Sequence, residues 1–144
     1  MKFWDSSALV PLLSNQPYTD AMREIAAGDP TIGVWWGTPV ECASALARLW
    51  RQRVIGAEAH EQAHRRLRRL AGEWYTVEAT RELRELALRQ LRTHPLRAGD
   101  ALQLAAALVW AEESPTGREM VSLDERLRDA ALREGFEVLP GGAQ

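Results

Sequence analysis

Short apolar runs alternate with longer stretches of helical periodicity along the chain. The runs predict strands over 2–4, 31–36, 74–77, 119–123 and 136–139. Apolar spacing, together with the positions of Pro and Gly, predicts helices over 8–13, 18–27, 38–53, 57–70, 79–92, 99–111 and 124–133. Strands that alternate with helices favour right-handed parallel crossovers. We therefore expect an α/β fold, a three-layer α/β/α sandwich around a mostly parallel five-stranded sheet.

Two of the predicted helices differ sharply in polarity. The helix over 99–111 is uncharged between Asp100 and Glu112, so we expect it to be mostly buried. The helix over 57–70 is rich in arginine and has only a thin apolar stripe. No internal repeat, low-complexity run or linker divides the sequence, so 1–140 is expected to form one domain, followed by a flexible tail over 141–144.

Four acidic residues occupy similar positions in this pattern. Asp5 and Asp124 follow predicted strands, whereas Glu41 and Asp100 lie in the first turns of predicted helices. Because the strand-to-helix turns of a parallel sheet gather at one edge, we expect these four acids to converge on one crevice.

Each acid alone also has an ordinary structural explanation, because acids favour helix N-termini. Thr38 and Glu41 match a capping box, and Ser122 and Glu125 match a second one in which Asp124 is an additional first-turn acid. The shared placement of all four acids is harder to explain by capping, and it favours a functional site.

A crevice of carboxylates requires a neutralising partner. Two like charges about 4 Å apart repel by about 4 kcal/mol at an effective dielectric of about 20, and Lys2 is the only lysine in the chain. Oxygen-only ligands favour Mg²⁺ or Mn²⁺, whereas zinc favours His and Cys. Such an ion supports hydrolysis of phosphodiesters. Ser7 and Ser122 lie beside the acids, where they can hydrogen-bond a phosphate or a water molecule. The hypothesis requires all four carboxylates to lie within reach of one cation.

Composition narrows the class of protein. The 144 residues are 46% hydrophobic, which is enough for a single core, and the lone Cys42 excludes an internal disulfide. Neither a charged-plus-apolar leader nor a long apolar span is visible, so we expect a soluble cytoplasmic protein without membrane association. The net charge of -2 argues against a general polyanion binder, and no P-loop or GxGxxG motif occurs. The arginines at 65, 66, 68 and 69 form either a solvated face or a track for an RNA backbone.

Four stretches of the sequence resemble the PIN domain and, within it, the VapC-type toxins of bacterial toxin–antitoxin pairs. These are 3–10 (FWDSSALV), 38–41 (TPVE), 96–107 (LRAGDALQLAAA) and 121–127 (VSLDERL). The resemblance implies a Mg²⁺-dependent endoribonuclease, with Mn²⁺ as a second option, which leaves a 5′-phosphate. It also implies an RNA substrate, a homodimer and a cognate antitoxin of a type II system.

The resemblance also implies roles for individual residues. Asp5, Asp100 and Asp124 would bind the metal, and Glu41 would bind it directly or through water. Arg97, in the third stretch, is a candidate substrate contact. Gln103 stands where many members of the family have His, and Gly99 stands where larger residues are common.

Three alternatives remain. His60 to His64 match the HExxH pattern of zinc hydrolases, with the distant His94 as the only further histidine. A receiver-like signalling module would need two adjacent acids after the first strand and a late lysine, both of which are missing. A catalytically inactive PIN-like binding domain is the third. The six tryptophans are expected mainly in the core, and the helix over 41–53 is a candidate surface for the dimer or the antitoxin.

Overall fold

The protein has five strands and seven helices within residues 1–141, the part described by the computed structural model. The strands are β1 (Lys2–Trp4), β2 (Ile32–Trp35), β3 (Tyr75–Val77), β4 (Glu119–Val121) and β5 (Glu137–Leu139). The helices are α1 (Ser6–Leu13), α2 (Thr19–Gly28), α3 (Thr38–Arg51), α4 (Ala57–Ala71), α5 (Arg81–Thr93), α6 (Ala98–Trp110) and α7 (Glu125–Glu134). The expected tail lies outside the described residues, apart from Gly141.

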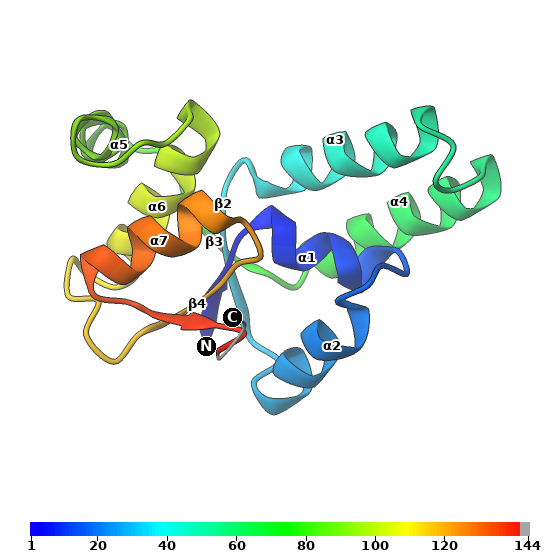
Figure 1. The fold of residues 1–144 in the computed structure, drawn as a ribbon, viewed down its shortest axis with the longest axis horizontal. Helices are drawn as coiled ribbons and strands as arrows, with labels where there is room; N and C mark the ends of the chain where they lie inside the picture. Colours follow the sequence, from blue (N-terminus) through cyan, green and yellow to red (C-terminus); the bar gives the residue numbers. More distant parts are fainter. Residues whose placement is uncertain (142–144) are drawn as a thin grey trace.

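All five strands are parallel, in the order β3-β2-β1-β4-β5. The strand β1 is therefore central, with β2 and β4 on either side. Helices cover both faces of the sheet: α1 to α4 lie on one side and α5 to α7 on the other (Figure 1). This arrangement confirms the predicted three-layer α/β/α sandwich.

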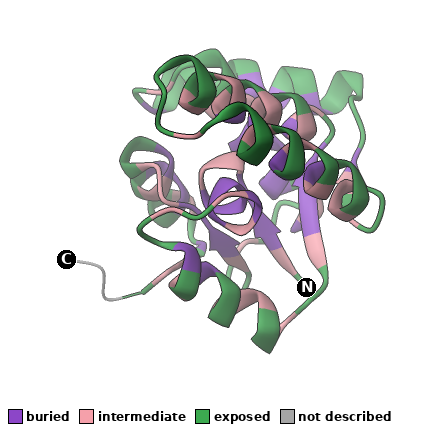
Figure 2. Ribbon diagram, turned by 90° about the vertical axis from the view of Figure 1, so that its right-hand side faces the viewer, coloured by how far each residue is buried: buried purple, intermediate pink, exposed green. Residues whose placement is uncertain are grey.

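The core consists of two apolar clusters, one on each face of the sheet. Phe3 faces α5, α6 and α7, whereas its neighbour Trp4 faces α1 to α4. This alternation follows from the pleat, which turns successive side chains to opposite faces. The inner strands and the inward helix faces are mostly buried, whereas the outward helix faces are exposed (Figure 2). Seven of the 13 residues of α6 are buried, in line with the burial that its lack of charges predicted.

Element ends agree with the prediction to within two residues. The fourth strand was expected to reach residue 123 but ends at Val121, because Asp124 takes the N-cap position of α7. None of the helices within residues 1–141 is long and apolar enough to cross a membrane.

Candidate active site

Asp5 lies directly after the central strand and is buried, with only 4% of the residue's surface exposed. Its backbone N–H donates to the Val121 carbonyl at 3.1 Å, which joins β1 to β4 at the carboxyl edge of the sheet. The Ser7 hydroxyl donates to Asp5 Oδ1 at 2.7 Å and accepts from the Leu123 N–H at 2.8 Å. Ser7 thus connects the first acid to the β4–α7 turn, where Ser122 lies 3.5 Å away.

Glu41, in the first turn of α3, is held by two neutral donors. Its Oε1 accepts from the Ser6 hydroxyl at 3.0 Å and from Gln103 Nε2 at 3.1 Å. Gln103 is 2% exposed and also donates to the Thr38 hydroxyl at 3.0 Å. Its Oε1 is buried without a hydrogen-bond partner among the described residues. The amide nitrogen of Gln103 therefore holds Glu41 in position, whereas the amide oxygen of Gln103 remains available as an acceptor.

The capping box expected between Thr38 and Glu41 does not form. Thr38 is inside α3, and the N-cap position belongs to Gly37, which has no side chain to cap the helix. The carboxylate of Glu41 is instead directed to Ser6 of α1 and Gln103 of α6. Helix capping therefore does not explain the position of Glu41.

Asp100 lies in the first turn of α6, and Asp124 lies at the start of α7. Asp100 Oδ2 accepts from the Arg97 N–H at 3.4 Å, at the start of α6. Asp124 is itself the N-cap of α7, because its Oδ1 accepts from the Leu127 N–H at 3.0 Å. The expected second capping box is thus also wrong: Ser122 Oγ accepts from the Asp124 N–H at 3.1 Å and leaves the cap to Asp124.

The four carboxylates interact electrostatically at this edge. Burial raises the pKa of Asp5 to about 7, the hydroxyls of Ser7 and Ser122 oppose the shift, and the charges of Asp124 and Glu41 add to it. Burial is also the main cause that raises the pKa of Glu41 and of Asp100, with further contributions from Asp100 to Glu41 and from Asp124 to Asp100. Each acid therefore makes ionisation of a neighbour more costly.

The side chains at this edge are of the types that bind a hard divalent cation, but they are not arranged as a complete metal site. Carboxylate, hydroxyl and amide oxygens are the ligands that Mg²⁺ prefers, and the buried Oε1 of Gln103 accepts no hydrogen bond from residues 1–141. As the side chains stand, however, no group of three or more His, Cys, Asp or Glu within residues 1–141 is arranged to hold a metal ion. The edge gathers the four acids without presenting a finished coordination sphere.

Two hollows flank the acids. One, of about 310 Å³, is lined by Arg97, Asp100, Asp124, Glu125 and Arg126. The positive charges of Arg97 and Arg126 partly offset the rise in the pKa of Asp100. The other, of about 850 Å³, includes Ser6, Ser7 and Glu41. Arg126 was missed in the sequence because a single arginine in a helix rich in charges gives no distinguishing signal.

The arginines at 65, 66, 68 and 69 line neither hollow. They belong to α4, where Arg66 donates to the Leu13 carbonyl at 2.9 Å and Arg65 pairs with Glu61 at 3.6 Å. Arg68 lies beside Pro39 and Val40 in a separate apolar hollow. The cluster is thus a helix face with structural contacts, displaced from the acids.

The histidines and tryptophans also have identifiable neighbours. His60 stacks on Trp50 with ring centroids 4.6 Å apart, and His94 Nε2 contacts Glu134 Oε2 at 2.6 Å. His94 thus pairs with α7 and does not join the HExxH segment of α4. The expectation for tryptophans holds for Trp4 and Trp35, which are buried, whereas Trp36 and Trp50 are exposed.

A family model for the PIN domain matches residues 2–133, and the chain belongs to this family. PIN domains are generally nucleases, which supports a hydrolase that acts on nucleic acid, and they typically use divalent metals. No curated protein sequence matches the chain.

Solved structures of toxin–antitoxin proteins share the fold. VapC20 of Mycobacterium tuberculosis, a toxin that cleaves the sarcin-ricin loop, is 19% identical with a TM-score of 0.67, covering 90% of this chain and 95% of its own. FitAcB of Neisseria gonorrhoeae is 15% identical with a TM-score of 0.66, covering 96% of each chain. A toxin–antitoxin complex of Klebsiella pneumoniae is 15% identical with a TM-score of 0.63, covering 86% of this chain and 87% of its own.

Proposed function

We propose that this PIN-domain protein is a metal-dependent endoribonuclease and the toxin of a type II toxin–antitoxin pair. The observation that carries the proposal is the electrostatic coupling of Asp5, Glu41, Asp100 and Asp124 at one sheet edge, with the pKa of the buried Asp5 raised to about 7. Partly buried carboxylates that raise one another's pKa are costly to ionise unless a cation neutralises them. The toxin–antitoxin structures that share the fold support the biological role.

The four acids would hold Mg²⁺ or Mn²⁺, with Asp5 as the buried member. When bound, the ion supplies charge stabilisation at the phosphate and lowers the pKa of an attacking water. The chain's own residues supply position. Ser7 orients Asp5, while Ser6 and Gln103 orient Glu41. Arg97 and Arg126 line the adjacent hollow, where guanidinium groups suit the phosphates of a bound strand.

The first test uses total bacterial RNA as substrate. The purified protein should cut it with Mg²⁺ or Mn²⁺, leave 5′-phosphate ends and stop on addition of EDTA. Asp5→Asn and Asp100→Asn should lower the rate by about two orders of magnitude or more. Asp20→Asn is the matched control, because Asp20 is exposed in the first turn of α2, away from the acids. RNA binding without turnover by the wild type would support an inactive PIN-like binding domain and contradict the nuclease.

The toxin role has a separate test. Induced expression of the wild type in a bacterial host should arrest growth, and Asp5→Asn should not. Co-expression of the cognate antitoxin should restore growth and yield a complex on gel filtration, in which the toxin is expected as a homodimer. A nuclease that leaves growth unchanged would retain the enzymatic proposal and remove the toxin role.

A further inference from the structure

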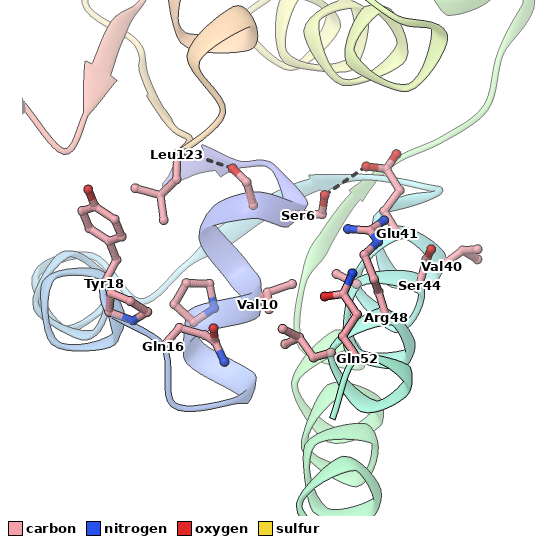
Figure 3. Close-up of a pocket in the computed structure, with 15 residues that line it drawn as sticks. Ser6, Val10, Gln16, Tyr18, Val40, Glu41, Ser44, Arg48, Gln52 and Leu123 are labelled. Atoms are coloured by element: carbon pink, nitrogen blue, oxygen red, sulfur yellow. Dashed lines mark hydrogen bonds between the residues drawn. The ribbon is translucent and has the colours of Figure 1, made fainter. Parts of the chain in front are cut away.

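A groove extends from the acid edge along α1 and α3. It has a volume of about 850 Å³, which lies in the range of small-ligand sites. Ser6 and Glu41 line one end of it, so the groove and the acids share residues. Figure 3 shows α1 between two walls, with α3 on one side and Gln16 and Tyr18 on the other. An RNA chain with one phosphodiester at the acids can therefore continue into this groove.

The lining combines an apolar floor with a polar rim. Val10, Pro11 and Leu49 supply apolar surface, and Arg48 is the only cation among the lining residues. Arg48 and Gln52 are exposed residues near the end of α3. Their side chains extend back toward the Glu41 end of the groove (Figure 3), as helical side chains do. A cation and an amide thus lie within one groove, over an apolar floor.

Tyr18 forms part of the opposite wall. Its side chain is 52% exposed, although tyrosine rings usually bury much of their surface. It stands at the N-cap position of α2 without capping the helix. An exposed ring at the mouth of a groove provides a face for stacking.

We infer that this groove is a subsite for an unpaired nucleotide of the RNA, next to the scissile phosphodiester. The base stacks on Tyr18 above the apolar floor, Arg48 contacts the adjoining phosphate, and Gln52 meets the base edge. Unpaired bases are bound in this way, by aromatic faces, guanidinium groups and amides. The inference rests on the proposed ribonuclease function and identifies the residues that would recognise a nucleotide of the substrate.

The alternative occupant is an apolar segment of a protein partner. The single cation favours the nucleotide, because Arg48 lies between the floor and the acids, where a backbone phosphate would pass. The second hollow, with Arg97 and Arg126, lies across the acids. Arginines on both sides of an acidic centre match a polyanion that crosses it, since only the phosphate at the centre needs a metal ion.

The experiment measures binding separately from cleavage. A fluorescein-labelled single-stranded RNA of about 12 random nucleotides is titrated in Ca²⁺, and anisotropy gives the Kd. Tyr18→Ala and Arg48→Ala should each raise the Kd by about 5- to 20-fold. Tyr75→Ala and Arg92→Ala are matched controls, because Tyr75 is 54% exposed on β3 and Arg92 is exposed on α5. Both controls should stay within about twofold. Circular dichroism confirms that all four variants fold.

Cleavage supplies the second readout. In Mg²⁺, Tyr18→Ala should raise KM more than it lowers kcat, and it should change the base preference beside the cut. Equal Kd values for groove and control variants, with an RNA-binding wild type, would overturn the subsite and leave the ribonuclease intact. The same pattern with loss of antitoxin binding only in the groove variants would assign the groove to a protein partner. A wild type that neither binds nor cuts RNA removes the proposed function itself.

Discussion

Asp5 is an ionisable side chain that the fold places in a buried position, which disfavours its charged form. Its position after the central strand buries a carboxylate near the charges of Asp124 and Glu41, and the resulting pKa of about 7 is a cost that the folded protein carries. Such strained carboxylates are typical of functional sites. The stability of the protein should therefore depend on pH through this residue.

The pH dependence has a definite direction. The pKa of Asp5 is about 7 in the folded protein against an ordinary value of 3.8, so the folded state binds the proton more tightly. The stabilisation is fully present below about pH 4 and is lost as the pH rises through 7. In EDTA, the melting temperature of the wild type should fall between about pH 5 and pH 8. Asp5→Asn, which is neutral throughout, should show a weaker fall and melt higher at pH 8. Parallel curves for the two proteins would contradict the burial of a coupled charge.

Gln103 should act as a positioning residue for Glu41. Gln103→Leu removes the donor 3.1 Å from Glu41 Oε1, and it should lower kcat by about tenfold and raise the Mg²⁺ concentration needed for half-maximal activity. Gln103→His keeps an N–H donor and should retain most of the activity. A Leu variant with normal Mg²⁺ dependence would show that the hydrogen bond is only structural.

The placement of the four acids at one sheet edge could be predicted from the sequence, but their hydrogen-bond partners could not. Asp5 and Asp124 were located because each follows a short apolar strand, and sheet geometry then brings them together. The contacts of Gln103 with Glu41 and of Ser7 with the Leu123 N–H join residues 62 and 116 positions apart. No local pattern encodes such pairs. The capping box at Thr38 failed for the same reason, because distant donors outcompete the local one.

At the scale of elements, α7 shows how one side chain serves two purposes. Asp124 caps the helix by accepting from the Leu127 N–H and also adds charge to the acid edge. Asp124→Asn keeps the cap, since Asn and Asp cap equally well, and should leave stability nearly unchanged while it abolishes cleavage. Asp124→Ala should lose cleavage and also about 1 kcal/mol of stability. Urea unfolding of the two variants measures the difference, and equal losses would mean that the cap is not significant.

The helix α6 should be the element least tolerant of truncation. Leu104 is fully buried between the sheet and the neighbouring helices, so Leu104→Ala should cost about 2–5 kcal/mol. Val109→Ala, at a position 37% exposed on the same helix, should cost less than about 1 kcal/mol. Denaturant midpoints with an unchanged slope give both values. Similar losses at both positions would contradict the packing described for α6.

Helix and strand identities were predictable because each element is buried in a periodic way, whereas element ends were not. The helix expected over 79–92 begins at Arg81, since the Thr80 hydroxyl accepts from the Leu83 N–H and sets the first turn. The end of β4 at Val121 and the start of α7 depend on Asp124 as a cap. Competition between several polar residues for one cap position depends on the tertiary surroundings.

In the molecule as a whole, positive and negative charges nearly cancel, but they are unevenly distributed over the surface. The net charge is only -2, yet the acids occupy one sheet edge with Arg48 on one side and Arg97 and Arg126 on the other. A divalent ion should relieve the repulsion at this edge and so stabilise the entire fold.

This stabilisation is measurable without any substrate. Mg²⁺ at about 100 times its Kd should add about 2.7 kcal/mol to the free energy of unfolding, which corresponds to a rise in melting temperature of several degrees. Asp20→Asn should respond like the wild type, whereas Asp100→Asn should respond weakly. A flat response of the wild type at neutral pH would count against a shared ion site.

The helix α3 carries both Glu41 and Arg48, seven residues apart. At about 1.5 Å per residue, this places their backbone positions about 10 Å apart along one rigid rod, on the same face. In the proposed complex with RNA, the helix would fix the distance between the scissile bond at Glu41 and the adjoining phosphate at Arg48. A variant with one extra helical turn between the two residues should cut the same RNA at a displaced position, which mapping of the product ends would reveal.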